Sequence, residues 1–339
     1  MWECRESNGQ IVIPIFYDVS PSDVIHQAGD FGRRFDLHET AKVDSDTIKK
    51  WRDVLRQIGR LRGFIRENVN GHDSQLVKIV VKSVEQVLRK DDQVVTDRLV
   101  GIDHHVQEMM KKLGVAYREG QAVEVQGEEV RVVIIEGAPG VGKTTLAKVV
   151  FNKMRKLFDA YSFLEDIRSE GVQFSRHMLI ADLQKQKPEP LESSGEEIAN
   201  LCRNVRVLIV LDGVDEDEQI KELVGKFTSF GPGSRIIVTT DKRNVSEAFD
   251  VGAFDRRTVE LHKVGPMSEK NALDLFHKHA FQGAAAEDVS EYDSLSRDIV
   301  KAIGGLPSEI VHHASNLRRN MNMDTWKTTL DLLRKKPKK

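Results

Sequence analysis

The stretch Gly137-Ala138-Pro139-Gly140-Val141-Gly142-Lys143-Thr144-Thr145 is the most informative part of the sequence. It follows an apolar run, 130–135, that is interrupted only by Arg131. Its glycines allow the backbone to turn with several N–H groups facing one point, an arrangement that Cβ atoms would obstruct. A helix after the loop would add the positive end of its dipole. This order of strand, glycine-rich loop and helix predicts a cradle for phosphate groups.

The residue types in the loop predict a nucleotide and a metal ion. The spacing matches G-x-x-x-x-G-K-[S/T], in which the lysine reaches the β- and γ-phosphates and the hydroxyl binds Mg²⁺. Lys143 and Thr144 occupy these positions. A plain glycine-rich surface turn is the alternative, but the flanking strand and helix favour the phosphate loop. The predicted nucleotide contacts are Gly137, Pro139, Gly140, Val141, Gly142, Lys143, Thr144 and Thr145.

A second run, 205–211, is apolar except at Arg206 and ends at Asp212. A buried strand that delivers a carboxylate beside the phosphate loop can hold Mg²⁺ directly or through water. We therefore expect Thr144 and Asp212 to form the metal site. Residues 161–164 are a further strand candidate, and 233–240 predict a turn followed by a buried strand.

Composition limits the other kinds of function. The 339 residues allow two or three domains, and a net charge of −2 gives no general attraction to nucleic acid or membranes. The two cysteines, and the histidine pairs at 104–105 and 312–313, lack the spacing of a metal site. No apolar run is long enough to cross a membrane. We expect a cytoplasmic protein; the basic run 334–339 leaves a nuclear location open.

Apolar patterns predict elements on both sides of the loop. Residues 11–17 are typical of a strand buried on both faces and precede a turn at 20–23. Helical spacing follows at 48–58 and 73–89. Later signals predict a helical region: an N-cap at Ser268, a capping box of Ser290 and Asp293, a stop at Gly304-Gly305, and an apolar face of Trp326, Leu330 and Leu333.

Residues 1–90 resemble the C-terminal half of a plant-type TIR domain, through Ile13-Pro14-Ile15-Phe16-Tyr17-Asp18-Val19-Ser20-Pro21-Ser22-Asp23-Val24. The resemblance implies part of a flavodoxin-like fold. In that family the glutamate for NAD cleavage precedes the segment that matches residues 2–5. Glu3 and Glu6 are therefore expected to be surface carboxylates, and NAD cleavage is expected to be absent.

Val100-Gly101-Ile102-Asp103 and Gly305-Leu306-Pro307, taken with the phosphate loop, resemble the NB-ARC module of plant disease-resistance proteins. The segment Phe163-Leu164-Glu165-Asp166-Ile167-Arg168 resembles its TIR-linked branch. The resemblance implies that Val100, Gly101 and Pro307 contact adenine, and that the ligand is ADP or ATP with Mg²⁺. Because Ser308-Glu309-Ile310 is less apolar than the family pattern, we expect the helix after Pro307 to pack loosely.

The resemblance also divides the chain into domains. It implies a partial TIR domain over 1–90, a linker over 91–98, a nucleotide-binding domain over 99–255 and a helical ARC subdomain over 256–339. The expected fold class is α/β, with a P-loop NTPase parallel sheet flanked by helices, preceded by the partial flavodoxin-like TIR half and followed by the small helical subdomain.

Two positions depart from the family pattern. Gly213 stands where a second aspartate helps to position or activate water, and Asp241 stands where an arginine senses the terminal phosphate. Glycine can neither accept a proton nor orient water, so the departure at 213 argues against efficient hydrolysis. Lys242 or Arg243 could replace the arginine after a local shift. We expect Asp241 to weaken the preference between nucleotides or to tilt it towards the diphosphate.

Three functional hypotheses follow. The first is an ADP- or ATP-binding switch or adaptor in plant immune signalling, with partners that themselves contain TIR or NB-ARC domains and with neither nucleic acid nor membrane as a partner. The second is a slow Mg²⁺-dependent ATPase. The third is a degenerate gene product that binds nothing productively. Gly213 and Asp241 favour the first hypothesis over the second.

Overall fold

The computed structural model describes residues 12–40, 43–61, 63–66, 73–88, 92–185, 197–224, 230–243, 245, 259–281 and 286–335. These residues fall into two compact units, one up to Leu88 and one from Asp92 onwards. No helix among them is long and apolar enough to cross a membrane. Glu3 and Glu6 lie outside the described residues, as do residues 336–339 of the basic run.

The first unit consists of helices and one small pair of strands. Its strands, β1 (Ile15–Phe16) and β2 (Phe64–Ile65), pair in parallel. Its helices are α2 (Pro21–His26), α3 (Gly29–Thr40), α4 (Ser45–Arg60) and α5 (Asp73–Leu88). Helices α4 and α5 lie where the apolar spacing predicted them.

The structure corrects two expectations for this unit. The strand expected over 11–17 is only Ile15–Phe16 within the described residues, and Ile15 is 47% exposed rather than buried on both faces. The turn expected at 20–23 is the start of α2. The Ser20 hydroxyl accepts a hydrogen bond from the Asp23 amide over 3.0 Å, and Pro21 supplies a φ suited to the first helical position.

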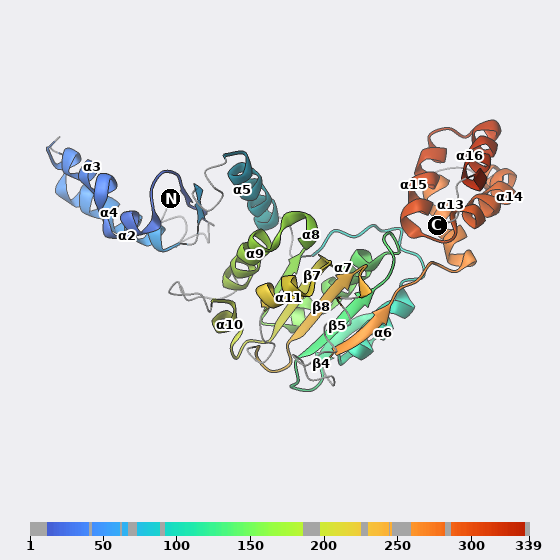
Figure 1. The fold of residues 1–339 in the computed structure, drawn as a ribbon, viewed down its shortest axis with the longest axis horizontal. Helices are drawn as coiled ribbons and strands as arrows, with labels where there is room; N and C mark the ends of the chain where they lie inside the picture. Colours follow the sequence, from blue (N-terminus) through green and yellow to red (C-terminus); the bar gives the residue numbers. More distant parts are fainter. Residues whose placement is uncertain are drawn as a thin grey trace. The chain divides into compact units, whose positions relative to one another are not determined.

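The second unit is built on a five-stranded sheet in the spatial order β6-β7-β8-β5-β9 (Figure 1). Every neighbouring pair of strands is parallel. The strands are β5 (Arg131–Glu136), β6 (Ala160–Leu164), β7 (Val207–Val214), β8 (Arg235–Thr240) and β9 (Val259–Lys263). β5 lies between β8 and the edge strand β9, so the loop that follows it opens at the carboxyl ends of the strands, beside the segment that follows β8. The expected α/β class is confirmed.

Helices cover both faces of this sheet. Along β5, Val132 and Ile134 pack with the helices of one face, and Val133 and Ile135 pack with those of the other. Burial on both faces explains why the strands are near-continuous apolar runs. The helices are α6 (Asp103–Lys112), α7 (Lys143–Met154), α8 (Ile167–Glu170), α9 (Val172–Lys185), α10 (Glu197–Cys202) and α11 (Asp217–Val224), with a 3₁₀ turn at Arg155–Leu157.

Some strands of the second unit were not expected from the sequence. β3 (Val115–Arg118) and β4 (Gln121–Val125) form an antiparallel hairpin, and its turn residues Glu119 and Gly120 both have positive φ, 49° and 79°. β9 lies within 256–339, the range assigned above to the helical subdomain. Its pairing with β5 places Val259–Lys263 in the sheet.

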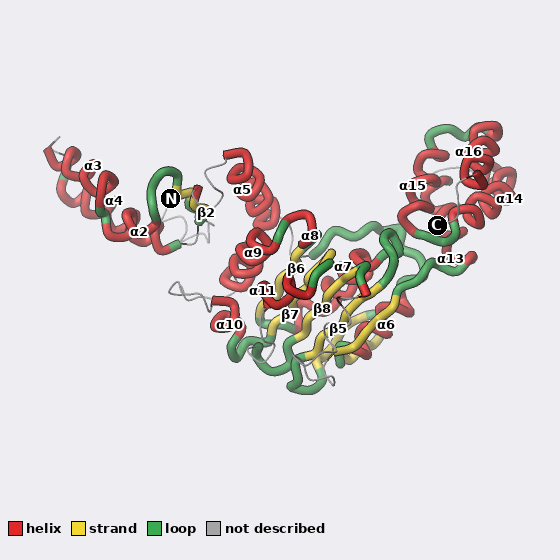
Figure 2. Tube along the Cα trace, viewed as in Figure 1, coloured by secondary structure: helices red, strands yellow, loops and turns green. Residues whose placement is uncertain are grey.

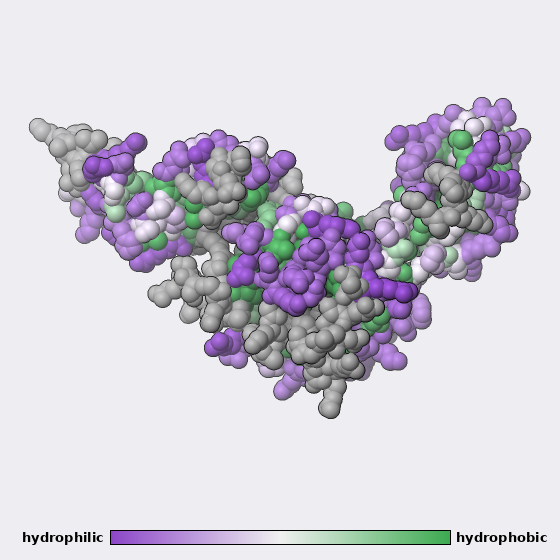
Figure 3. Space-filling view, viewed as in Figure 1, coloured by the Kyte–Doolittle hydropathy of each residue, from purple (hydrophilic) through white to green (hydrophobic). Residues whose placement is uncertain are grey.

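Helices follow the sheet (Figure 2), and their buried side chains form one apolar cluster. These helices are α13 (Glu269–Ala280), α14 (Ala286–Ile303), α15 (Pro307–Arg318) and α16 (Met323–Lys335). The rings of Phe276, Phe281 and Tyr292 contact the fully buried Trp326. On the face shown in Figure 3, the surface of these helices is mainly hydrophilic, as expected where the apolar side chains face inwards.

The helix boundaries confirm some of the predicted signals and correct others. Ser268 caps α13 by accepting the Asn271 amide over 3.3 Å, and Gly304-Gly305, with φ of 81° and 80°, follows α14. The capping box was wrong, because α14 begins at Ala286 and continues through Ser290. Helix α15 is not loosely packed. The side chains of Ile310 and Ala314 are fully buried in the helical cluster.

Candidate nucleotide-binding site

The phosphate loop joins β5 to α7 in the conformation that its glycines allow. Gly140 and Gly142 have φ of 80° and 101°, a region that other residues rarely adopt. A Cβ on Gly137 would lie 2.3 Å from the carbonyl oxygen of Val264, the residue directly after β9, so only glycine fits there. Helix α7 begins at Lys143, directly after the turn. The predicted contacts from Gly137 to Thr145 therefore lie on one continuous loop and the first turn of a helix.

The Lys143 ammonium group lies over this loop. It donates hydrogen bonds to the carbonyl oxygens of Gly137, over 2.8 Å, and Ala138, over 3.1 Å. Burial lowers the pKa of Lys143, while the negative charges of Asp241 and Asp212 oppose that shift. These two carboxylates therefore act on the same lysine that is predicted to bind phosphate.

The side chains of Thr144 and Asp212, the two predicted metal ligands, are in direct contact. The Thr144 hydroxyl donates to Asp212 Oδ1 over 2.8 Å, and the Thr239 hydroxyl donates to the same oxygen over 2.6 Å. Asp212 is 5% exposed and lies on β7, beside the loop. A hydroxyl and a buried carboxylate are the hard oxygen donors that Mg²⁺ prefers. These residues thus fit a magnesium ion held between Thr144 and Asp212.

Gly213 has a structural reason to be glycine. Its φ is 73°, and the pairing of β7 with β8 is irregular between Leu211 and Val214. A Cβ on Gly213 would lie 3.3 Å from Cα of Asp166, just before α8, where few Cβ contacts are as short. Because Gly213 has no side chain, the segment around Asp166 that leads into α8 can pack against β7 next to Asp212.

Asp241 is paired with a cation that the sequence reasoning missed. Arg168, on α8, places Nη1 3.4 Å from Oδ2 of Asp241, although the two residues are 73 positions apart. Lys242 and Arg243, the substitutes considered from the sequence, are exposed. The sequence signal nearest to this pair is the segment Phe163–Arg168, whose last residue is this arginine. It gave no indication that Asp241 would be the partner.

Val100 and Gly101, two of the residues predicted to contact adenine, lie against the helical subdomain, and the third, Pro307, lies where that subdomain meets the phosphate loop. Gly101 has a φ of 66°, and a Cβ there would lie 2.2 Å from the side-chain nitrogen of Asn271 on α13. Val100 packs against the helical cluster. Pro307 is the first residue of α15, and the amide of the next residue, Ser308, donates to the Gly140 carbonyl over 3.2 Å. Ser308 is a second residue of the site that was not predicted.

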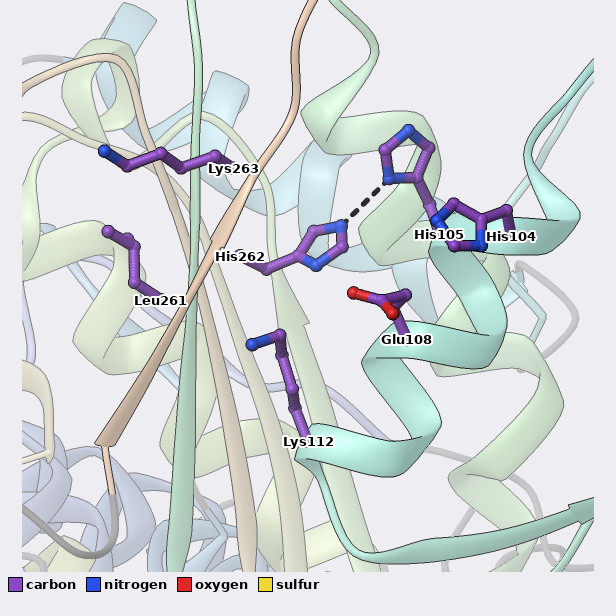
Figure 4. A pocket seen from close by; sticks show the side chains of 7 residues that line it. All are labelled: His104, His105, Glu108, Lys112, Leu261, His262 and Lys263. Carbon is purple, nitrogen blue, oxygen red and sulfur yellow. Dashed lines mark hydrogen bonds between the residues drawn. The ribbon is translucent and has the colours of Figure 1, made fainter.

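A separate pocket lies between α6 and β9 (Figure 4). Its volume is about 320 Å³, and Nδ1 of His105 lies 3.0 Å from Nε2 of His262. Within the described parts of the chain, no group of three or more histidine, cysteine or acidic residues is arranged to hold a metal ion. The pocket is lined by His104, His105, Glu108, Lys112, Leu261, His262 and Lys263.

The sheet, the loop and the Thr144–Asp212 pair define an α/β protein of the P-loop NTPase fold class. The NB-ARC domain model matches residues 118–286, and the TIR domain model matches residues 1–102. The chain therefore carries both domains and is homologous over nearly its whole length to plant disease resistance proteins, of which it covers only a part. An NB-ARC domain implies nucleotide binding.

Individual relatives support this assignment. Over 97% of its length the chain is 30% identical to "TMV resistance protein N" of Nicotiana glutinosa, and it covers 28% of that protein. Over 99% of its length it is 32% identical to "Disease resistance protein RPV1" of Vitis rotundifolia, and it covers 23% of that protein. The chain thus spans about a quarter of these relatives. A solved structure, "Structure of Drosophila ORC bound to DNA", aligns with 76% of this chain and with 69% of its own chain, at 12% identity and with a TM-score of 0.46.

Proposed function

We propose that the protein is an ADP- or ATP-binding switch or adaptor of plant immune signalling, with Mg²⁺ bound between Thr144 and Asp212. The observation that carries the proposal is the hydrogen bond between the Thr144 hydroxyl and Asp212, made directly beside the phosphate loop. In the bound state, Lys143 would turn from the loop carbonyls to the phosphates, and Val100, Gly101 and Pro307 would contact adenine. Immune signalling is proposed because the relatives are named as resistance proteins.

The proposed organisation follows from the same resemblance. Residues 1–90 would act as a TIR segment, 91–98 as a linker, and the remainder as nucleotide-binding domain and helical subdomain. Its protein partners would be immune-signalling proteins that contain TIR or NB-ARC domains, and its location would be cytoplasmic or nuclear. A slow ATPase is the second candidate, favoured by the intact Thr144–Asp212 pair and disfavoured by Gly213.

Two measurements test nucleotide binding. Mass spectrometry of the purified protein should detect a co-purifying adenine nucleotide. In a titration, Lys143→Ala should weaken nucleotide affinity roughly 10- to 150-fold, because a charge-assisted contact with phosphate is lost. The matched control is Lys153→Ala, which removes a lysine at the other end of the same helix. Absence of binding by the wild type would support the degenerate-gene hypothesis instead.

A further inference from the structure

The two departures from the family pattern meet in one place in the structure. Gly213 leaves room for the segment before α8, where Cα of Asp166 lies 3.3 Å from the position of a Cβ. Two residues further on, Arg168 reaches Asp241. A side chain at 213 would press on the segment that carries the arginine. The glycine and the aspartate are thus parts of one local arrangement.

Asp241 is held at the edge of the phosphate site. It directly follows β8, whose Thr239 hydroxyl donates to the magnesium-site carboxylate of Asp212. The Asp241 side chain is 14% exposed, and its Oδ1 is buried without a hydrogen-bond partner, so this carboxylate lacks one expected contact. Its charge acts on Lys143, as does that of Arg168. Asp241 and Arg168 therefore lie within electrostatic reach of the group that binds phosphate.

The Arg168 side chain is more exposed than that of Asp241 and keeps N–H donors for a further partner. The Arg168 side chain is 47% exposed, and the Asp241 pair at 3.4 Å uses only part of its five N–H donors. A guanidinium group can bind a carboxylate and a phosphate oxygen at the same time, because its donors point in several directions. Its positive charge also offsets the repulsion that Asp241 alone would exert on a triphosphate.

We propose that Arg168, oriented by Asp241, binds the terminal phosphate of ATP and makes the site distinguish ATP from ADP. An arginine on α8 thereby takes the place of the arginine that position 241 lacks. The proposal rests on the proposed nucleotide binding and specifies which residue senses the third phosphate. It reverses the expectation that Asp241 tilts the preference towards the diphosphate.

The test compares the affinities of the full chain for ADP and for AMP-PNP, an ATP analogue that resists hydrolysis, both with Mg²⁺. Arg168→Gln should weaken AMP-PNP binding about 10-fold and change ADP binding by less than about 2-fold. The matched control is Arg297→Gln, which breaks an arginine–aspartate pair of 3.0 Å on α14. The control should leave both affinities unchanged.

Exchanging the charges of Arg168 and Asp241 tests whether an arginine is needed at position 168 itself or only somewhere in this pair. Arg168→Asp alone should lose the preference for AMP-PNP, and adding Asp241→Arg should restore it in part, because an arginine then stands at position 241, where the family pattern places the arginine that senses the terminal phosphate. Equal effects of Arg168→Gln on both nucleotides, or no effect on either, would overturn this inference while leaving nucleotide binding intact. If the wild type bound neither nucleotide, the proposed function itself would fail.

Discussion

The backbone amide of Ser308 donates to the Gly140 carbonyl over 3.2 Å, so the first turn of α15 is bonded directly to the phosphate loop. The contact leaves little space, since a Cβ on Gly140 would lie 2.1 Å from the Ser308 hydroxyl oxygen. We therefore expect a ligand in the loop and the position of the helical subdomain to influence each other.

A charge at position 308 should test this contact. Ser308→Asp would bring a carboxylate next to the phosphate loop, and we expect it to weaken binding of ADP about 5- to 30-fold through repulsion of the phosphates. Ser308→Asn is the matched control of similar size without the charge. Titration of both variants checks the prediction, and an equal loss for the two would show that size rather than charge is responsible.

Gly213→Asp tests whether the missing second aspartate limits hydrolysis. We expect the variant to release phosphate from Mg-ATP faster than the parent, because a carboxylate beside the site can orient or activate water. The left-handed φ of 73° should also cost about 1–2 kcal/mol of stability.

Gly213→Asn is the control for this experiment, because it introduces the same backbone strain without a base. Phosphate release is measured for all three proteins. A parent that already turns over as fast as Gly213→Asp would support the ATPase hypothesis over the switch.

Arg235 should matter for stability rather than binding. The side chain is fully buried and donates to the carbonyl oxygens of Gln126, over 2.8 Å, of Glu129, over 2.7 Å, and of Leu113. Burial lowers the pKa of Arg235 to about 10, so it stays charged at neutral pH. Arg235→Met should reduce the free energy of unfolding by ~3 kcal/mol or more, since the carbonyls lose their donor.

Urea denaturation measures this loss, with Arg297→Met as an exposed control on α14. An arginine in an exposed helical pair contributes only about 0.3–0.5 kcal/mol. Similar losses for the two variants would contradict the structural role of Arg235.

The sequence was sufficient to predict the strand, loop and helix around Lys143 and four of the five strands of the sheet. The phosphate loop and Asp212 were identified because their chemistry depends on residue types at fixed spacing. Four strands were visible as apolar runs, whereas β9 was missed because Val259-Glu260-Leu261-His262-Lys263 mixes apolar and charged residues at a sheet edge. An edge strand needs apolar side chains on fewer positions, so its pattern is weaker.

The contacts between distant segments could not be predicted in this way. Arg168 and Asp241 come from different elements, and only the order of the strands brings β8 and the segment after β6 close together. The same holds for Ser308, which reaches Gly140 through the packing of α15. Spacing rules describe residues on one element, and these pairs depend on how elements are arranged.

The first unit should be unstable or should associate with a partner. Its strands have two residues each, and two strands rarely persist in water without further cover. Apolar side chains are exposed on β1 and along α5, with Ile15 at 47%, Val77 at 58% and Val81 at 50%. We expect rapid amide exchange at Phe16 in a monomer and slower exchange in an oligomer. Slow exchange in a demonstrated monomer would argue against this prediction.

His262 should make stability depend on pH. Its side chain is 4% exposed, and its Nε2 faces Nδ1 of His105 at 3.0 Å, so one ring donates and the other accepts. Burial, and then the proximity of His105 and Lys112, lowers the pKa of His262 to about 4. Burial and His104 also lower the pKa of His105, which Glu108 opposes. Protonation of both rings would place two cations against each other.

The sign of the effect follows from these shifts. The unfolded chain binds a proton at His262 near pH 6.5, and the folded protein does so only near pH 4. Between these values the unfolded state holds more protons, so stability should fall as pH decreases, by up to about 1.4 kcal/mol per pH unit. His262→Phe, which cannot titrate, should reduce this slope between pH 6.5 and pH 4. The control is His312→Phe, an exposed histidine on α15, and equal slopes in urea denaturation for His262→Phe and the wild type would contradict the prediction.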